Sequence, residues 1–434
     1  MKSRLALACA LALGAGSAFS QAAKTGTPVT AESFVQIYGH VDVSIDYLTK
    51  GINEGDSSIF GTTPAAGKLG YQPDVSSNLS YFGVRGARDL GDSGLRAVFQ
   101  IETQVDVAAT PGSTTDSSVK AAFGSRNSYV GLAGGWGAVK AGKTDAPYKL
   151  STARMDPFSA SIGDYNSIIG NTGGDNRAEF DTRLSHAVWY ESPNWSGFRV
   201  NVLFAPGQNR ATDNSIAASG EPACTGGNPP PCTDGSFGDA VSIAGTYEAG
   251  ALYLTAGYEK HKDVNRLGDE ATGGGPAPAG TVGVRNEQAW KAGIQYTFAT
   301  KTTINAIYES LTRDAPDANF NERQHKAYWL AATQKIGERD DVNVGWAHAG
   351  KSPGDPNVGP VDNEANMLAL GYKHHFDRQT TAYAVYAHQA NHAGAHYDLG
   401  ASGHGITTDC HDANGNCFPG TTLQGASVGV QYDF

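Results

Sequence analysis

The chain has 434 residues, of which 40% are hydrophobic, only 17% are charged and 55 are glycine, and its net charge is −11. No stretch beyond the N-terminus approaches the roughly 20 consecutive apolar residues that a membrane-spanning helix needs, which excludes a helical membrane protein. The acidic balance argues against nucleic acid as a partner. Abundant glycine, few charges and many aromatic residues fit a long β protein, which would cross a membrane only as strands.

The first residues have the pattern of a secretory signal peptide. Lys2 and Arg4 precede an apolar run over residues 5–19, and small residues follow up to Ala22. This order of basic, apolar and small residues is typical of an exported precursor. We predict a signal peptide at residues 1–22, with cleavage after Ser20 or, preferably, after Ala22, and a mature protein at residues 23–434.

Residues 34–48 alternate between apolar and polar side chains with hardly a break. The same period of two recurs at residues 252–259 and 290–298. Successive side chains of a strand point to opposite faces, so each segment predicts a strand with one apolar and one polar face.

Seven short and eight long connections alternate along the chain, which predicts about sixteen strands. The short ones are residues 89–94, 134–137, 193–197, 248–251, 298–302, 337–341 and 374–380. The long, polar ones are residues 50–77, 107–122, 144–181, 206–237, 261–284, 313–322, 349–364 and 390–421. An even strand number, with short turns on one side and long loops on the other, is typical of bacterial outer-membrane barrels.

A closed barrel also satisfies the backbone, because hydrocarbon offers no water to unpaired N–H and C=O groups. We therefore predict an all-β fold, a sixteen-stranded antiparallel transmembrane β-barrel without a domain linker. The alternative is a soluble all-β protein such as a lectin-like sandwich, which does not need alternating short and long connections.

Aromatic residues and the C-terminus support the membrane assignment. The last strand alternates over residues 426–434 and ends on Phe434, with Tyr432 two residues earlier, which resembles the signal read by the outer-membrane insertion machinery. Aromatic residues near strand ends would form the two interfacial girdles, namely Tyr296, Phe298, Tyr372, Phe376, Trp189 and Trp195.

Four cysteines follow the signal peptide as two close pairs, Cys224 with Cys232 and Cys410 with Cys417, each in a loop-like segment. In an exported protein this spacing predicts two loop-closing disulfides, although four cysteines permit three connectivities. Zinc binding or free thiols are the alternatives, but neither pair has zinc-finger spacing.

Short motifs that are weak singly occur in order along essentially the whole mature chain. They are residues 37–42, 81–86, 89–91, 94–102, 126–132, 190–198 and the terminal strand. In this order they resemble the general porins of Gram-negative outer membranes, most closely those of β-proteobacteria. The resemblance implies a homotrimer of barrels in outer-membrane lipid. Each barrel would carry a water-filled channel for passive diffusion of ions and small hydrophilic solutes, without a cofactor.

The resemblance also implies that the third long connection, residues 144–181, folds inward and narrows the pore. Residues 156–158 and 161–166 resemble the constriction segment, which gives Asp156 and Asp164 the acidic side. An ordinary surface loop is the alternative, since Gly, Asp and Asn are turn formers.

The facing wall in this family carries a ladder of basic residues, whose positions match His40, Tyr81, Arg126 and Arg183. Acids facing bases across a narrow pore would sort solutes by size, charge and dipole. At neutral pH, however, we expect His40 to be mostly neutral, and Tyr81 cannot carry positive charge. Arg85 lies on the same strand face as Tyr81 and could partly replace the missing cation. The sequence therefore predicts weak or absent anion preference.

The last long loop holds a set of histidines that could bind a divalent ion or respond to pH, namely His388, His392, His396, His404 and His411. Their spacing is not that of a tight ligand set, so no metal site is predicted.

Two other functions would fit a barrel. An outer-membrane enzyme would need a nucleophile, a base and an orienting group held together, and no such set is evident, so no catalytic residue is predicted. An adhesin or anchor would carry its function in the long loops. Channel recordings separate both from a porin.

Overall fold

Antiparallel strands make up most of the described chain. The computed structural model describes residues 33–50, 69–108, 123–171, 180–206, 237–265, 284–314, 324–352, 362–392, 394–395, 397–399, 420 and 422–434. The predicted signal peptide and several predicted loop residues lie outside them, namely Cys224, Cys232, Cys410, Cys417, His396, His404 and His411.

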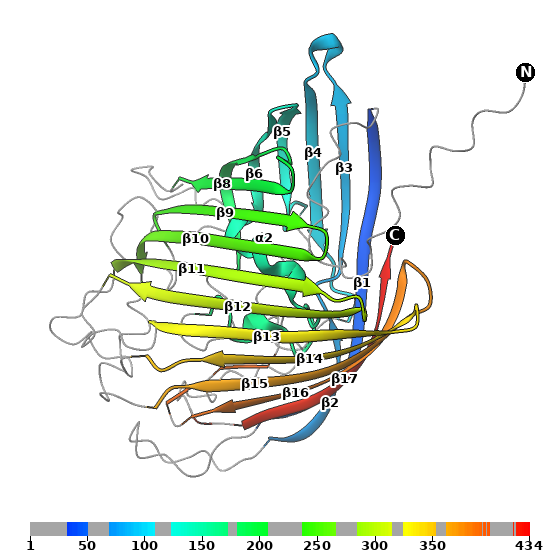
Figure 1. Ribbon diagram of the computed structural model, residues 1–434, viewed down its shortest axis with the longest axis vertical. Helices are drawn as coiled ribbons and strands as arrows, with labels where there is room; N and C mark the ends of the chain where they lie inside the picture. Colours follow the sequence, from blue (N-terminus) through cyan, green and yellow to red (C-terminus); the bar gives the residue numbers. More distant parts are fainter. Residues whose placement is uncertain are drawn as a thin grey trace, which may run out of the picture.

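Seventeen strand segments form one sheet (Figure 1). They are β1 (Phe34–Lys50), β2 (Leu69–Ser77), β3 (Tyr81–Asp89), β4 (Arg96–Gln104), β5 (Ser128–Gly134), β6 (Gly137–Asp145), β7 (Arg183–Glu191), β8 (Phe198–Ala205), β9 (Asp239–Ala249), β10 (Leu252–Asn265), β11 (Val284–Thr297), β12 (Thr302–Arg313), β13 (His325–Ile336), β14 (Asp340–Ala349), β15 (Ala365–His375), β16 (Thr380–Asn391) and β17 (Thr422–Asp433).

Within the described residues, helices are few and short. They are η1 (Gly91–Ser93), α2 (Pro147–Thr152), η2 (Ala153–Met155) and η3 (Tyr165–Ser167). Among the described residues, no helix has the length and apolar character needed to cross a bilayer.

The sheet closes on itself through β1. One edge of β1 pairs with β17, where Val43 lies opposite Val430. The other edge pairs first with β3, where His40 lies opposite Tyr81, and then with β2, where Val43 lies opposite Ser77. Each remaining strand pairs antiparallel with its neighbours along the chain.

β2 and β3 are two halves of one barrel strand. They follow each other along the same edge of β1, and Leu79 between them has φ 55°, which interrupts the ladder. Counted together, they give the predicted barrel of sixteen antiparallel strands. The expected first loop, residues 50–77, was too long, because residues 69–77 pair with the end of β1. This half-strand contains glycine, proline and serine, which have weak strand propensity, so the sequence resembles a loop. Its pairing with β1 overrides that propensity.

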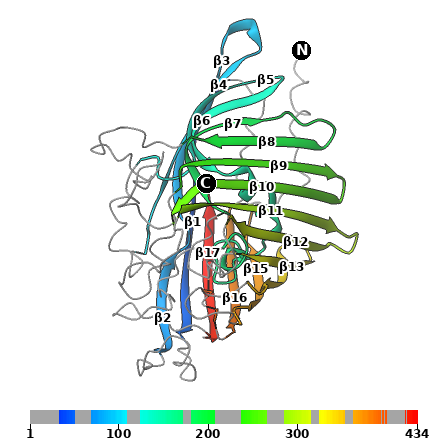
Figure 2. The same ribbon diagram turned by 90° about the vertical axis from the view of Figure 1, so that its left-hand side faces the viewer.

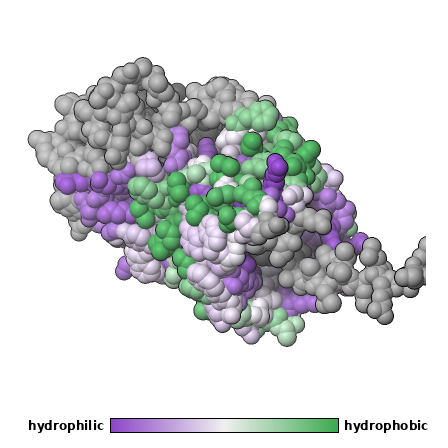
Figure 3. All heavy atoms as spheres, turned by 90° about the horizontal axis from the view of Figure 1, so that it is seen from above, coloured by the Kyte–Doolittle hydropathy of each residue, from purple (hydrophilic) through white to green (hydrophobic). Residues whose placement is uncertain are grey.

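Alternation separates two faces, as the sequence predicts. In β1, Val35 and Ile45 are 71% and 64% exposed, whereas His40, Asp42 and Ser44 are buried. The apolar face therefore points outward to lipid and the polar face into the lumen. Figure 3 shows apolar side chains gathered over part of the wall, bordered by polar ones.

Five of the six residues predicted for the aromatic girdles are exposed on the barrel, as that prediction requires. Trp195, Tyr296, Phe298, Tyr372 and Phe376 are exposed. Trp189 was wrong: it is 4% exposed and donates a hydrogen bond from Nε1 to Glu191 Oε1 at 2.8 Å. The exposed neighbour Val188 takes the outer face, so the strand alternation turns Trp189 inward.

Loop 3 joins β6 to β7, and its described residues, 146–171 and 180–182, pack inside the barrel (Figures 1 and 2). Its Phe158 side chain is buried and edge-on to Trp329 of β13, with 6.3 Å between ring centroids. Trp329 Nε1 donates to the carbonyl oxygen of Met155 at 3.1 Å, and the Tyr253 hydroxyl donates to that of Ser151 at 2.7 Å. The loop therefore rests on the inner wall of the later strands.

Candidate functional site

Three of the residues predicted from sequence form a row on the inner wall. The His40 ring of β1 stacks on Tyr81 of β3, with centroids 5.7 Å apart. The Arg126 guanidinium, just before β5, lies 4.7 Å from the Tyr81 ring centroid, a distance suited to a cation–π contact. Pairing of β1 with β3 brings the first two together, because His40 and Tyr81 lie opposite each other.

Arg126 has an acidic partner that sequence reasoning missed. Its Nε lies 2.6 Å from Glu102 Oε1 of β4, and both side chains are largely buried. The Tyr38 hydroxyl donates to the other Glu102 oxygen at 3.0 Å. The inward position of Glu102 follows from strand alternation, but its pairing depends on how the segment before β5 crosses β4.

Arg85 lies four residues along β3 from Tyr81 and apart from this row. Its Nε and Nη2 donate to Gln36 Oε1 at 3.0 and 2.9 Å, and its guanidinium lies 4.8 Å from the Tyr38 ring centroid. It shares the lumen face with Tyr81, as the sequence predicts.

Arg183, the first residue of β7, is paired as well. Its Nη2 lies 3.1 Å from Asp145 Oδ1, and its Nε donates to Asn127 Oδ1 at 2.7 Å. Lys149 of α2 lies 3.1 Å from the same Asp145 oxygen. A single wall carboxylate thus links an arginine of the wall to a lysine of loop 3.

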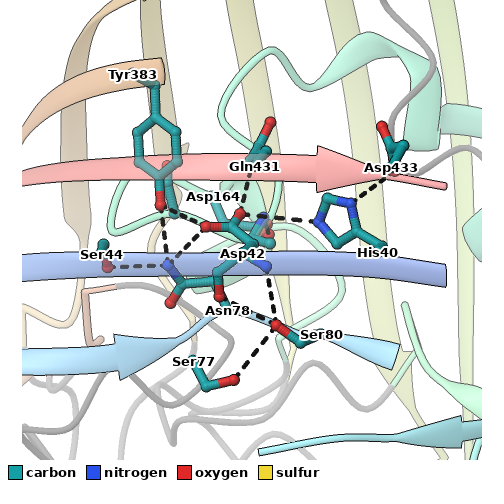
Figure 4. A network of polar contacts seen from close by, with 12 residues as sticks. His40, Asp42, Ser44, Ser77, Asn78, Ser80, Asp164, Tyr383, Gln431 and Asp433 are labelled. Atoms are coloured by element: carbon teal, nitrogen blue, oxygen red, sulfur yellow. Dashed lines mark hydrogen bonds and ion pairs between the residues drawn. The ribbon is translucent and has the colours of Figure 1, made fainter. Parts of the chain in front are cut away.

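His40 also joins a polar network where β1 meets β17, which Tyr383 of β16 reaches with its hydroxyl (Figure 4). Its Nδ1 lies 2.8 Å from Asp433 Oδ1. The neighbouring Asp42 accepts hydrogen bonds from Gln431 Nε2 and the Tyr383 hydroxyl, each at 2.8 Å. These contacts hold the two ends of the barrel together on its inner side.

Asp156 and Asp164 fold loop 3 on itself. Asp156 accepts from the amides of Phe158 and Tyr165 at 2.9 and 3.1 Å, and Asp164 accepts from those of Ala160 and Asn166, both at 2.8 Å. The two residues are only 9% and 4% exposed.

Burial changes the protonation of this pair. Burial and the neighbouring Asp164 carboxylate raise the pKa of Asp156 well above its usual value. Burial also raises the pKa of Asp164. Two carboxyl groups in one buried turn cannot both ionise readily, so the pair shares a proton.

A second buried group attaches loop 3 to the wall. Glu309 of β12 accepts from the Tyr148 hydroxyl and, at 2.8 Å, from the Gly170 amide. Lys291 of β11 forms an ion pair with Asp181, and both side chains are fully buried. Alternation predicts that Glu309 and Lys291 face inward, but only the path of the loop reveals their partners.

At the long-loop end of β15 and β16, Asp362, Glu364 and His392 bring their side chains together. Within the described residues this is the one group of three His, Cys, Asp or Glu side chains close enough to share a metal ion. His388 lies outside that group.

Comparisons with known proteins match porins over most of the chain. The Gram-negative porin family model matches residues 6–394. An outer membrane porin protein of Bordetella pertussis is 24% identical over 84% of this chain and 90% of its own length. The fold resembles the anion-selective porin from Comamonas acidovorans, with TM-score 0.64, 21% identity, and coverage of 93% of this chain and 100% of that one. It also resembles a trimer form of Vibrio cholerae OmpT, with TM-score 0.55, 15% identity, and coverage of 93% and 100%.

Proposed function

The chain belongs to the Gram-negative porin family, and we propose which residues narrow its channel and which ions the channel favours. It is an outer-membrane porin, which forms a water-filled channel for passive diffusion of ions and small hydrophilic solutes. A porin is a channel rather than an enzyme. What remains to assign is the set of residues that meets the solute.

The constriction lies between loop 3 and the wall that bears His40, Tyr81, Arg126 and Arg183, with Arg85 further along the same face. The path of loop 3 is the observation that supports this assignment: the loop rests on strands β9 to β15, opposite the row of ladder positions in the closed sheet. A polypeptide segment that fills part of a lumen must narrow what is left for solutes.

The charges at this constriction largely compensate one another. Arg126 is paired with Glu102, and Arg183 shares Asp145 with Lys149. Asp156 and Asp164 direct their oxygens at loop amides and share a proton, so they serve mainly to shape the loop. We therefore expect a weak preference between small anions and cations, despite the anion selectivity named for the Comamonas porin.

The porin is a homotrimer that is exported with cleavage of residues 1–22, and its long loops carry disulfides between Cys224 and Cys232 and between Cys410 and Cys417. The trimer form of Vibrio cholerae OmpT, which has a similar fold, supports the homotrimer. The order of basic and apolar residues at the start of the chain supports export with cleavage of a signal peptide. The short spacing within each cysteine pair supports the two disulfides.

A planar bilayer recording of the purified protein in a salt gradient tests this function. We expect channel steps in groups of three and a reversal potential near zero. Silent insertion would contradict the channel. Single steps without grouping would contradict the trimer alone, and a large reversal potential of either sign would contradict the compensated constriction.

A further inference from the structure

Three side chains that can bind a metal meet at the long-loop end of two adjacent strands. Asp362 and Glu364 lie just before β15, and His392 follows the last residue of β16. His392 Nδ1 lies 2.9 Å from Asp362 Oδ2 and 3.8 Å from Glu364 Oε2. One nitrogen and two oxygens therefore converge from the bases of two different loops.

The backbone fixes this convergence. The His392 amide donates to the carbonyl oxygen of Glu364 at 2.9 Å, and the Gly394 amide donates to that of Asp362 at 2.8 Å. These bonds continue the ladder in which Ala365 lies opposite Asn391. The side chains are thus carried on paired backbone, which preorganises their donor atoms.

The donor separations fit one small cation. With metal–ligand bonds of about 2.1 Å, adjacent donors lie about 3.0 Å apart in an octahedral site and about 3.4 Å apart in a tetrahedral one. The two separations from His392 Nδ1 bracket these values, and the three donor atoms lie within 4.8 Å of one another. Small adjustments of exposed side chains would complete the geometry.

The ligand types also suit a cation. His392 Nδ1 lies 2.9 Å from Asp362 Oδ2, and a metal ion bound between them would replace this direct contact. An imidazole among the ligands favours first-row transition cations over Mg²⁺ and Ca²⁺, which prefer oxygen.

We propose that Asp362, Glu364 and His392 bind one transition divalent cation, such as Zn²⁺, which joins the bases of the two loops that flank β15 and β16. The site lies on the outer face of the barrel, because the adjacent Asn363, Ala365 and Asn391 are buried on the inner side. The three ligand side chains are between 35% and 52% exposed, so water can fill the open coordination positions.

Zinc titration of the detergent-solubilised porin, freed of metal by a chelator, tests the site by calorimetry. The variants are His392→Ala and Glu364→Gln, and the control is His388→Ala, which removes a histidine of β16 outside the cluster. Loss of a residue that only supports a metal ligand typically weakens metal binding by about 10- to 100-fold. Loss of a direct ligand should therefore weaken zinc binding at least about tenfold. Zinc bound elsewhere in the chain contributes equally to all four proteins.

We expect the wild type and His388→Ala to share one zinc site per chain that both ligand variants weaken. Isotherms of His392→Ala or Glu364→Gln that coincide with the wild type would overturn the proposal. Because the site lies outside the lumen, zinc should leave conductance unchanged. A wild-type protein that conducts no current in the bilayer would contradict the proposed function, but the comparison of zinc binding between the variants would still hold.

Discussion

Glu309 of β12 accepts a hydrogen bond from the Tyr148 hydroxyl near the start of loop 3, while its second oxygen accepts one from the Gly170 amide near the end of that loop. One fully buried carboxylate thus contacts loop 3 at two points that are 22 residues apart in the sequence. Lys291 reinforces the same point, since its Nζ pairs with Asp181 and lies 4.1 Å from the Tyr148 ring centroid. The loop is attached by buried polar contacts as well as by its apolar side chains.

Removing the Tyr148 hydroxyl should loosen loop 3. In Tyr148→Phe the buried Glu309 oxygen loses its donor, which destabilises the attached loop by about 1–3 kcal/mol. We expect single-channel currents with larger fluctuations and a higher mean conductance, recorded in planar bilayers. Tyr372→Phe is the control, because that hydroxyl donates to Asp340 at 2.6 Å at an exposed site outside the lumen. Traces of Tyr148→Phe identical to wild type would show that other contacts hold the loop.

Glu102 should set the charge preference together with Arg126. A unit charge about 6 Å from a passing ion in water changes its energy by about 0.7 kcal/mol, or about threefold in permeability. Glu102→Gln leaves Arg126 without its carboxylate, so reversal potentials should shift toward anions. Arg126→Gln should shift them toward cations by a similar amount.

The matched control for Arg126→Gln is Arg88→Gln, which also removes a positive charge, but from an exposed side chain on the outer face of β3. It should leave the reversal potential unchanged. If Glu102→Gln and Arg126→Gln shift the potential in the same direction, the pair does not act at the constriction.

The buried pair of Asp156 and Asp164 predicts a dependence of loop 3 on pH. An unperturbed aspartate has a pKa of about 3.9, and both folded values are raised. The folded loop therefore binds the shared proton more tightly than the unfolded chain does. This stabilisation is complete below the unperturbed value and is lost as the pH rises toward the raised pKa.

We accordingly expect current fluctuations to grow from about pH 4 toward neutral pH. Asp164→Asn should flatten this profile, because Asp156 then has no carboxylate with which to share a proton. Asp377→Asn is the control: Asp377 also accepts from two backbone amides, at 2.7 and 2.8 Å, but in an exposed turn. A profile of Asp164→Asn that follows the wild type would refute the shared proton.

Strand number and strand faces were predictable because alternation records them locally, as β1 and β17 demonstrate. The inward position of Trp189 was not predictable, since residues 187–190 are four apolar or aromatic residues in a row, which leaves the outward ones undetermined, and β7 has a register shift against β6 nearby. β2, the first half of the second barrel strand, was not predicted because it contains turn-forming residues. The partners of Arg126, Lys291 and Glu309 depend on the paths of distant segments, which no local pattern encodes.

Gly39 and Phe434 should decide whether the barrel closes. Their backbones exchange two hydrogen bonds at 3.1 Å, and a Cβ on Gly39 would lie 2.4 Å from the Phe434 ring and 2.9 Å from the Tyr81 carbonyl oxygen. The ring can turn away, but the carbonyl belongs to the paired strand and cannot move without disturbing the ladder. We expect Gly39→Ala to destabilise closure by about 1–3 kcal/mol, as overpacking does.

The readout is the folded fraction after outer-membrane assembly, measured by heat-dependent gel mobility. Gly135→Ala is the control, because a Cβ there meets no atom within 4 Å. Equal folded fractions for the two variants would mean that contact between Gly39 and Phe434 does not limit closure.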